Sequence, residues 1–210
     1  MLLLAAVACG DEKGSASSKP LSRAQLSRAV LTQGDMPGYK ISKKSGSGNR
    51  DLVRADKKSC QPIVNAMDPE ALAYENRFAA SHIIKNTEGS RAPTAEYILT
   101  ISSVESASVA KRTVKDLKKA ISACNSGFKT GSSGLASKVS SVTAGEVSLG
   151  DEGVEFSVEY QSSLKRRYAV TQKGASLTTI VAQHASWRRL VPVPQKIVDA
   201  QRQKLAETVK

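Results

Sequence analysis

The sequence has few of the residues on which most enzyme active sites and metal centres depend. It contains only two histidines, one tryptophan and three cysteines among 210 residues. His82 and His184 each lie in a strand-like pattern without a metal-binding partner three or four residues away, so both are expected to be structural or surface residues and not zinc ligands. The sequence also lacks the Gly-x-Ser-x-Gly, His-Glu-x-x-His and Cys-x-x-Cys motifs. It therefore predicts no metal, no cofactor and no recognisable catalytic site.

Two polar pairs leave an enzymatic alternative open. Asp151 and Glu152 are adjacent carboxylates that could act as an acid–base pair, although in a glycine-flanked turn such residues more often only interact with water. Ser132 and Ser133 lie in the run Gly-Ser-Ser-Gly, which has the composition of a loop and lacks the strand–turn–helix setting of a nucleophilic serine. An enzyme would therefore need a constellation of residues that the sequence does not reveal.

The apolar stretch at the N-terminus is too short to cross a membrane. Residues 2–9 read Leu-Leu-Leu-Ala-Ala-Val-Ala-Cys, whereas a spanning helix takes about 20 apolar residues. An apolar run that ends in small residues and a cysteine is instead typical of the end of a bacterial lipoprotein signal. We therefore interpret residues 1–8 as a signal remnant and Cys9 as the lipidation site, which would hold the protein on the outer face of the cytoplasmic membrane.

The basic region with which a complete secretory signal begins is missing. No Lys or Arg precedes Lys13, and Ala6 stands where lipoprotein signals usually carry leucine. Either the true start lies upstream, or the segment has been trimmed, or it is the frayed apolar N-terminus of a cytosolic protein. The small, polar residues at positions 10–20 favour the lipoprotein interpretation, since such a segment cannot form a core. Residues 9–20 are thus predicted to be a flexible, lipid-anchored tether.

The cysteine count fits an exported protein. Once Cys9 carries lipid, Cys60 and Cys124 remain as a pair, and two thiols in an exported domain are usually bridged. Closing a loop of roughly 65 residues would stabilise the fold by about 4 kcal/mol in the chain-entropy model. The alternative is two unrelated buried thiols.

The formal net charge of +12 lies entirely beyond residue 8. Such a charge is typical of nucleic-acid-binding proteins. Export argues against that partner, and so does an aromatic content of 4%, which offers few platforms for stacking bases. We therefore expect no nucleic acid. Anionic lipid headgroups and cell-wall polyanions are the natural counter-charges outside the membrane, and the simpler alternative is that the charge only keeps the protein soluble.

The clearest helix is predicted over residues 106–125. Its apolar residues recur at intervals of four and three and so form one stripe: Ala110, Val114, Leu117, Ile121 and Cys124. This stripe directs Cys124 into the core, where it can meet Cys60. The opposite side carries a basic face: Lys111, Arg112, Lys115, Lys118 and Lys119. This face is a candidate surface for anionic lipid or polymer, and a solvated helix face is the default explanation.

The other segments predict an α+β fold. Ser22 and Gln25 have the spacing of a capping box at a helix start, and helical segments are also expected over residues 60–67 and 194–210. Strand-like segments come in runs, with a hairpin over 77–85 and 95–104 and clean alternation over 154–160. After the tether, residues 21–210 are predicted to be one domain, an antiparallel sheet of about five to six strands with helices packed on one face.

One aromatic–basic cluster is present, formed by Trp187, Arg188 and Arg189. It could anchor the protein at a membrane interface or bind an anionic ligand. Its expected main role is to cover the edge of the core.

The chain resembles a family of exported bacterial lipoproteins and receptor ectodomains that includes the extracellular sensor domain of a membrane serine/threonine kinase. The resemblance rests on a small set of segments: residues 34–39, 60–63, 104–124 and 150–153, and Gly174. It implies an antiparallel sheet flanked by helices, with a cleft for an unidentified extracytoplasmic ligand. That sensor domain has two disulfides, whereas this chain can form one. The resemblance supplies no catalytic residues.

The sequence therefore favours a non-enzymatic, lipid-anchored extracytoplasmic module that binds or senses an anionic or amphiphilic ligand in the cell envelope. The alternatives are a cell-envelope hydrolase with an unrecognised active site and a structural envelope lipoprotein.

Overall fold

The computed structural model describes residues 19–45, 53–69, 78–87, 95–132, 135–145, 149 and 152–208. The predicted signal remnant 1–8, the predicted lipidation site Cys9, Asp151 and most of the predicted tether lie outside the described residues. No helix among the described residues is long and apolar enough to cross a membrane.

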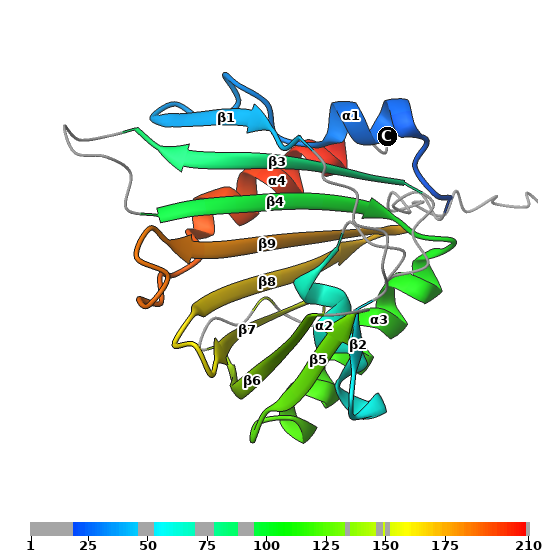
Figure 1. Cartoon of the computed structure of the whole chain (residues 1–210). Helices are drawn as coiled ribbons and strands as arrows, with labels where there is room; N and C mark the ends of the chain where they lie inside the picture. The colour runs from blue at the N-terminus through cyan, green and yellow to red at the C-terminus, as the bar shows by residue number, and fades with distance from the viewer. Residues whose placement is uncertain are drawn as a thin grey trace, which may run out of the picture.

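In the described part of the chain, nine antiparallel strands form one sheet (Figure 1). The strands are β1 (Tyr39–Lys43), β2 (Arg54–Ala55), β3 (Phe78–Asn86), β4 (Ala95–Ser103), β5 (Phe128–Ser132), β6 (Leu135–Ala144), β7 (Gly153–Tyr160), β8 (Lys165–Lys173) and β9 (Ser176–His184). Their order across the sheet is β1-β3-β4-β9-β8-β7-β6-β5-β2.

Four α-helices accompany the sheet in the described residues: α1 (Arg23–Ala29), α2 (Gln61–Met67), α3 (Ala107–Ala123) and α4 (Gln195–Thr208). A 3₁₀ turn, η1 (Lys58–Cys60), leads directly into α2. The predicted capping box is present at α1, because the Gln25 amide donates to Ser22 Oγ at 3.3 Å and the Ser22 amide donates to Gln25 Oε1 at 2.9 Å. The helix predicted over residues 106–125 is α3, which begins after a Ser106 cap.

The helices cover both faces of the sheet. Successive side chains of a strand point to opposite faces, and on β8 the side chains of Tyr168 and Val170 join the core beneath α2 and α3, whereas Ala169 joins the core beneath α1 and α4. We call these two sides the α3 face and the α4 face. In Figure 1, α4 lies behind the upper strands and α2 lies in front of the sheet.

The structure corrects two parts of the predicted architecture. The described part of the sheet has nine strands where five to six were expected, since β2 is only two residues long and β5 contains Gly131 and Ser132, whose composition is typical of a loop. The expectation that helices pack on one face is wrong. Strand β9 is buried on both sides, and such a strand lacks the alternation of apolar and polar residues that distinguishes a covered face from a solvent-exposed face.

The hairpin of β7 and β8 pairs opposite charges on the α4 face. Glu159 lies opposite Lys165 in the register, with 3.3 Å between the Lys165 ammonium and the carboxylate. Arg167 lies 3.1 Å from the Glu155 carboxylate. Because side chains alternate along each strand, the sequence predicts that these four charged residues share one face. Pairs of opposite charge on neighbouring strands help to set the register between the strands.

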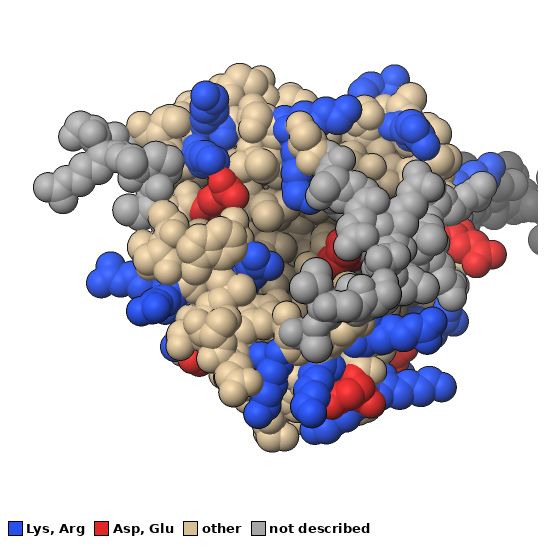
Figure 2. Space-filling model, viewed as in Figure 1, with Lys and Arg blue, Asp and Glu red and all other residues tan. Residues whose placement is uncertain are grey.

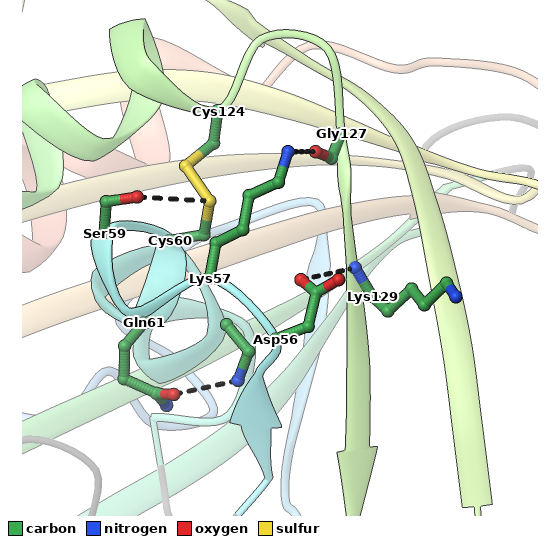
Figure 3. The surroundings of a disulfide bond; sticks show 9 residues. Asp56, Lys57, Ser59, Cys60, Gln61, Cys124, Gly127 and Lys129 are labelled. Atoms are coloured by element: carbon green, nitrogen blue, oxygen red, sulfur yellow. Dashed lines mark hydrogen bonds between the residues drawn. A yellow bond between two sulfur atoms is a disulfide. The ribbon is translucent and has the colours of Figure 1, made fainter.

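The disulfide joins the start of α2 to the end of α3 (Figure 3). Cys60 and Cys124 are separated by 64 positions in sequence, their Cα atoms are 5.9 Å apart, and both residues are completely buried. The predicted pair is thus bridged in the structure. Nearby, Asp56 Oδ1 accepts a hydrogen bond from the Lys129 amide at 3.0 Å and Lys57 Nζ donates to the Gly127 carbonyl at 3.2 Å, so the segment before α2 is also bound to β5 and the turn preceding it.

Gly127 makes the sharp turn between α3 and β5 possible. Its φ is +81°, in the left-handed region that favours glycine. A Cβ at this position would lie 2.3 Å from the Val139 carbonyl oxygen, so a larger residue would push β5 away from β6.

Candidate ligand-binding site

Strands β1, β3 and β4 present mainly polar side chains on the α3 face. The register places them together: Lys40, Ser42, Ser81, Lys85, Glu96, Thr100 and Ser102. Thr100 and Ser102 are almost completely buried, which is unusual for polar residues on the face of a sheet. Figure 2 looks onto this face and shows it hollowed near its centre, with basic and acidic side chains around the hollow.

Next to these strands, the α3 face carries a tyrosine–arginine cluster, which we define as Tyr160, Arg166, Tyr168 and Gln183. The antiparallel register pairs Arg167 with Ala182 and Tyr168 with Val181. Arg166 and Gln183 are therefore cross-strand neighbours on the same face. Directly opposed side chains begin about 5 Å apart at Cβ, so these groups can act on one bound molecule.

Two buried polar atoms of the cluster, Nε of Arg166 and Oε1 of Gln183, have no hydrogen-bond partner among the described residues. The Tyr168 hydroxyl interacts with the side chains of Arg166 and Tyr160. Tyr168 is completely buried and Gln183 is 7% exposed. A buried polar group without a partner costs roughly 1–3 kcal/mol, and such groups call for a ligand, ion or ordered water. One donor and one acceptor therefore remain available at one place on the sheet, beside the Tyr168 hydroxyl.

Neighbouring contacts hold these groups in position. Gln183 Nε2 donates to Glu96 Oε1 at 2.9 Å, which fixes the amide so that its oxygen points away from Glu96. Lys85 lies 2.8 Å from the other oxygen of Glu96. The ring of Tyr168 stacks on Phe156 with 4.9 Å between ring centroids and an angle of 10° between the planes. The donors and the acceptor are thus preorganised.

Burial keeps both tyrosine hydroxyls of the cluster protonated. It raises the pKa of Tyr168 well above the ordinary value of 10.0, the neighbouring Tyr160 raises it further, and Arg166 opposes the rise. Burial likewise raises the pKa of Tyr160, again opposed by Arg166. A raised pKa is the reverse of what activates a tyrosine as a nucleophile or base. The cluster therefore offers hydrogen-bond donors and one guanidinium, which suit an anionic or hydrogen-bond-accepting group.

The predicted basic face is located elsewhere. Lys111, Arg112, Lys115 and Lys119 are exposed on α3, on the side opposite the stripe that packs against the sheet. Lys118 is half-buried and has an interaction partner. The structure does not bring this face and the tyrosine–arginine cluster together, so they would have to act separately.

The other polar candidates have ordinary surroundings. Nδ1 of His82 lies 2.7 Å from the Leu31 carbonyl oxygen, and Nδ1 of His184 lies 2.7 Å from Ser186 Oγ. Glu152 is exposed and lies 3.9 Å from Arg202. Among the described residues, no three His, Cys, Asp or Glu side chains gather where they could hold a metal ion.

A surface hollow of about 680 Å³ lies between the end of α3 and β6. Its lining includes Ile121, Asn125 and Val142, and it contains no titratable side chain. It therefore lacks the charged or acid–base groups that the tyrosine–arginine cluster provides.

Sequence reasoning missed this cluster, although one signal was present. Side-chain alternation along β8 puts Arg166 on the same face as Tyr168 and Val170, and those two residues belong to the core. A basic residue on a buried face is uncommon. The presence of Arg166 there therefore identifies it as a candidate functional residue. Gln183 could not be found in this way because its neighbour on β8 depends on the register.

The fold is similar to that of a known extracellular domain. No family model and no curated protein matches the sequence. The structure is similar to the extracellular domain of PknH from Mycobacterium tuberculosis, with a TM-score of 0.58 and 11% sequence identity over 92% of this chain and 98% of that one. A weaker likeness, with a TM-score of 0.35 and 13% identity, links 89% of this chain to 92% of an uncharacterized protein from Mycobacterium smegmatis, the Rv0999 ortholog.

Proposed function

We propose that this chain is a non-catalytic binding or sensing module on the extracytoplasmic side of a membrane, and that the tyrosine–arginine cluster binds its ligand. The observation that carries this proposal is a buried donor and a buried acceptor without partners, Nε of Arg166 and Oε1 of Gln183, beside the completely buried Tyr168. The likeness of fold to the extracellular domain of a PknH protein supports the proposed location and role.

The cluster suggests the chemistry of the ligand. The Arg166 guanidinium and the protonated Tyr168 hydroxyl would donate to an anionic or carbonyl oxygen, and Gln183 Oε1 would accept from a hydroxyl or N–H group of the same molecule. An anionic envelope molecule that also carries hydroxyl or amide groups meets both requirements. Binding would satisfy groups that otherwise destabilise the protein, so ligand occupancy should raise its stability.

Replacing Tyr168 with phenylalanine is expected to have two effects. It removes a buried hydroxyl that interacts with the Arg166 and Tyr160 side chains, so the free energy of unfolding of the ligand-free protein should fall by about 1 kcal/mol. It also removes a donor to the ligand, so the ligand recovered with the protein should fall severalfold. Native mass spectrometry of protein purified from its host membrane measures the second effect, and chemical denaturation measures the first.

Tyr97→Phe is the matched control, because Tyr97 is a buried tyrosine on the α4 face. It should leave the bound ligand unchanged. Full ligand occupancy in the Tyr168→Phe protein would contradict the proposed site, and unchanged or higher stability of that variant would show that its hydroxyl contributes no net hydrogen bond in the ligand-free protein.

We further propose that a lipid on Cys9 anchors the module. Changing Cys9 to serine should then move the protein from the membrane fraction to the soluble fraction, because the acyl chains can no longer be attached. Immunoblotting of fractionated cells measures the distribution. Unchanged membrane retention of the variant would count against the anchor and would leave the ligand site to be judged by its own test.

A further inference from the structure

The loop between β9 and α4 exposes two large apolar side chains. Trp187 is 45% exposed and Leu190 is 37% exposed, and these are the exposed large hydrophobic residues of the described chain. Every residue from 185 to 190 is exposed. The expectation that Trp187 mainly covers the edge of the core is therefore not what the structure shows, and its outward position needs another explanation.

Basic groups surround this apolar pair. Arg188 and Arg189 are exposed between Trp187 and Leu190, and neither forms an ion pair within the described residues. The Arg166 guanidinium lies 5.4 Å from the centre of the Trp187 ring, within the range of a cation–π contact. The loop thus combines an indole, an aliphatic side chain and two guanidinium groups, and the Arg166 guanidinium of β8 lies beside the indole.

The backbone holds Trp187 in an uncommon conformation. Its φ is +61°, which bulky residues rarely adopt and which is often associated with function. Three hydrogen bonds maintain it: the Trp187 amide donates to the His184 carbonyl at 2.8 Å, the Arg188 amide to the Ser186 carbonyl at 2.7 Å, and the Lys165 amide to the Trp187 carbonyl at 2.7 Å. The loop therefore presents the indole outward in a defined position.

We propose that residues 187–190 form a membrane-contact loop that docks on an anionic lipid surface. Tryptophan is enriched at membrane–water interfaces, where its ring is partly apolar and its N–H can remain hydrated. Arginines beside it match the negative charge of anionic headgroups, and the chain's net charge of +12 favours the same approach. The loop lies at the opposite end of the sheet from α1 (Figure 1).

The test uses the full chain carrying Cys9→Ser, so that no lipid is attached, with vesicles of phosphatidylcholine alone or mixed with phosphatidylglycerol. Trp187 is the sole tryptophan of the protein, so its emission reports on the loop itself. We expect a blue shift with the mixed vesicles, reversed by high salt because the headgroup attraction is screened. Pure phosphatidylcholine vesicles should produce little shift.

Paired variants separate the loop from the basic face of α3. Arg188→Ser with Arg189→Ser should weaken binding to the mixed vesicles about 25-fold, since each basic residue near an anionic surface contributes about a fivefold gain. The matched control is Lys111→Ser with Lys115→Ser, which removes the same charge from α3 and should have a much smaller effect. Titration of the tryptophan shift measures both affinities.

Two results would overturn the proposal. The first is an unchanged emission spectrum when the chain sediments with mixed vesicles, since another segment would then make the contact. The second is unaltered binding of the Arg188→Ser, Arg189→Ser protein combined with lost binding of the α3 variant. Both arginines are exposed, so these substitutions should leave the unfolding midpoint unchanged, which verifies that the variants are folded.

Discussion

Replacing Cys60 and Cys124 together with alanine is expected to lower the free energy of unfolding by about 4 kcal/mol. The bridge spans 64 positions, so its loss releases a long loop in the unfolded chain. For a chain of this size the melting temperature should fall by about 10 °C. Calorimetry of the variant, and of the unaltered protein with and without reductant, measures the change.

Alanine is chosen because both cysteines are completely buried and a serine hydroxyl there would add its own cost of burial. Reductant should have no effect on the double-alanine protein, which serves as the control. A variant within about 1 kcal/mol of the unaltered protein would show that packing alone holds α2 against α3.

The disulfide also concerns the candidate site. Helix α2 has seven residues, fewer than an isolated helix needs to be stable in water, so it depends on its attachment to α3. Immediately after α2, the Pro69 carbonyl accepts a hydrogen bond from Ser102 Oγ on β4 at 3.1 Å. Loss of the bridge should therefore loosen the chain beside the polar part of the α3 face and weaken ligand binding as well as stability.

Replacing Gln201 with methionine is expected to lower the free energy of unfolding by about 3 kcal/mol. Gln201 lies on α4 and is completely buried. Its Oε1 accepts from the Leu31 amide at 3.1 Å, and its Nε2 donates to the Ala29 carbonyl at 2.7 Å. Methionine has a similar shape but no comparable donor or acceptor, so two buried backbone groups at the end of α1 would lose their partner.

Gln203→Met is the matched control for this experiment. Gln203 lies on the same helix, is exposed, and makes only a surface hydrogen bond to Glu207 at 3.1 Å. Its replacement should change stability by no more than about 0.5 kcal/mol. Urea denaturation of the two variants compares them directly, and equal losses would mean that the Gln201 contacts contribute little.

Local features were predictable because they depend on residues close together in sequence. The capping box of Ser22 and Gln25 and the apolar stripe of α3 belong to this group. So does the charge pairing between β7 and β8, because a tight hairpin brings Glu159 and Lys165 together. The disulfide could be predicted for a different reason: setting Cys9 aside as the predicted lipidation site leaves one pair of cysteines, and the α3 stripe directs Cys124 inward.

Features that depend on distant segments could not be predicted. Strand β2 contributes Arg54 and Ala55, and it is a strand only because β5 lies beside it. The burial of β9 on both faces follows from α4 packing on the side opposite α3. Gln201 is equally inconspicuous in sequence, since glutamine on a helix is usually exposed and its partners lie about 170 positions away.

By itself, the sequence determined the α+β class, the main helices and hairpins, the cysteine pair and the excess of positive charge. Short-range spacing and composition carry that information. Only the tertiary structure decided that helices cover both faces, that Arg166, Tyr168 and Gln183 share a buried site, and that Trp187 is presented to solvent. These outcomes depend on strand register and on which elements pack together, and neighbouring residues in the chain do not specify either.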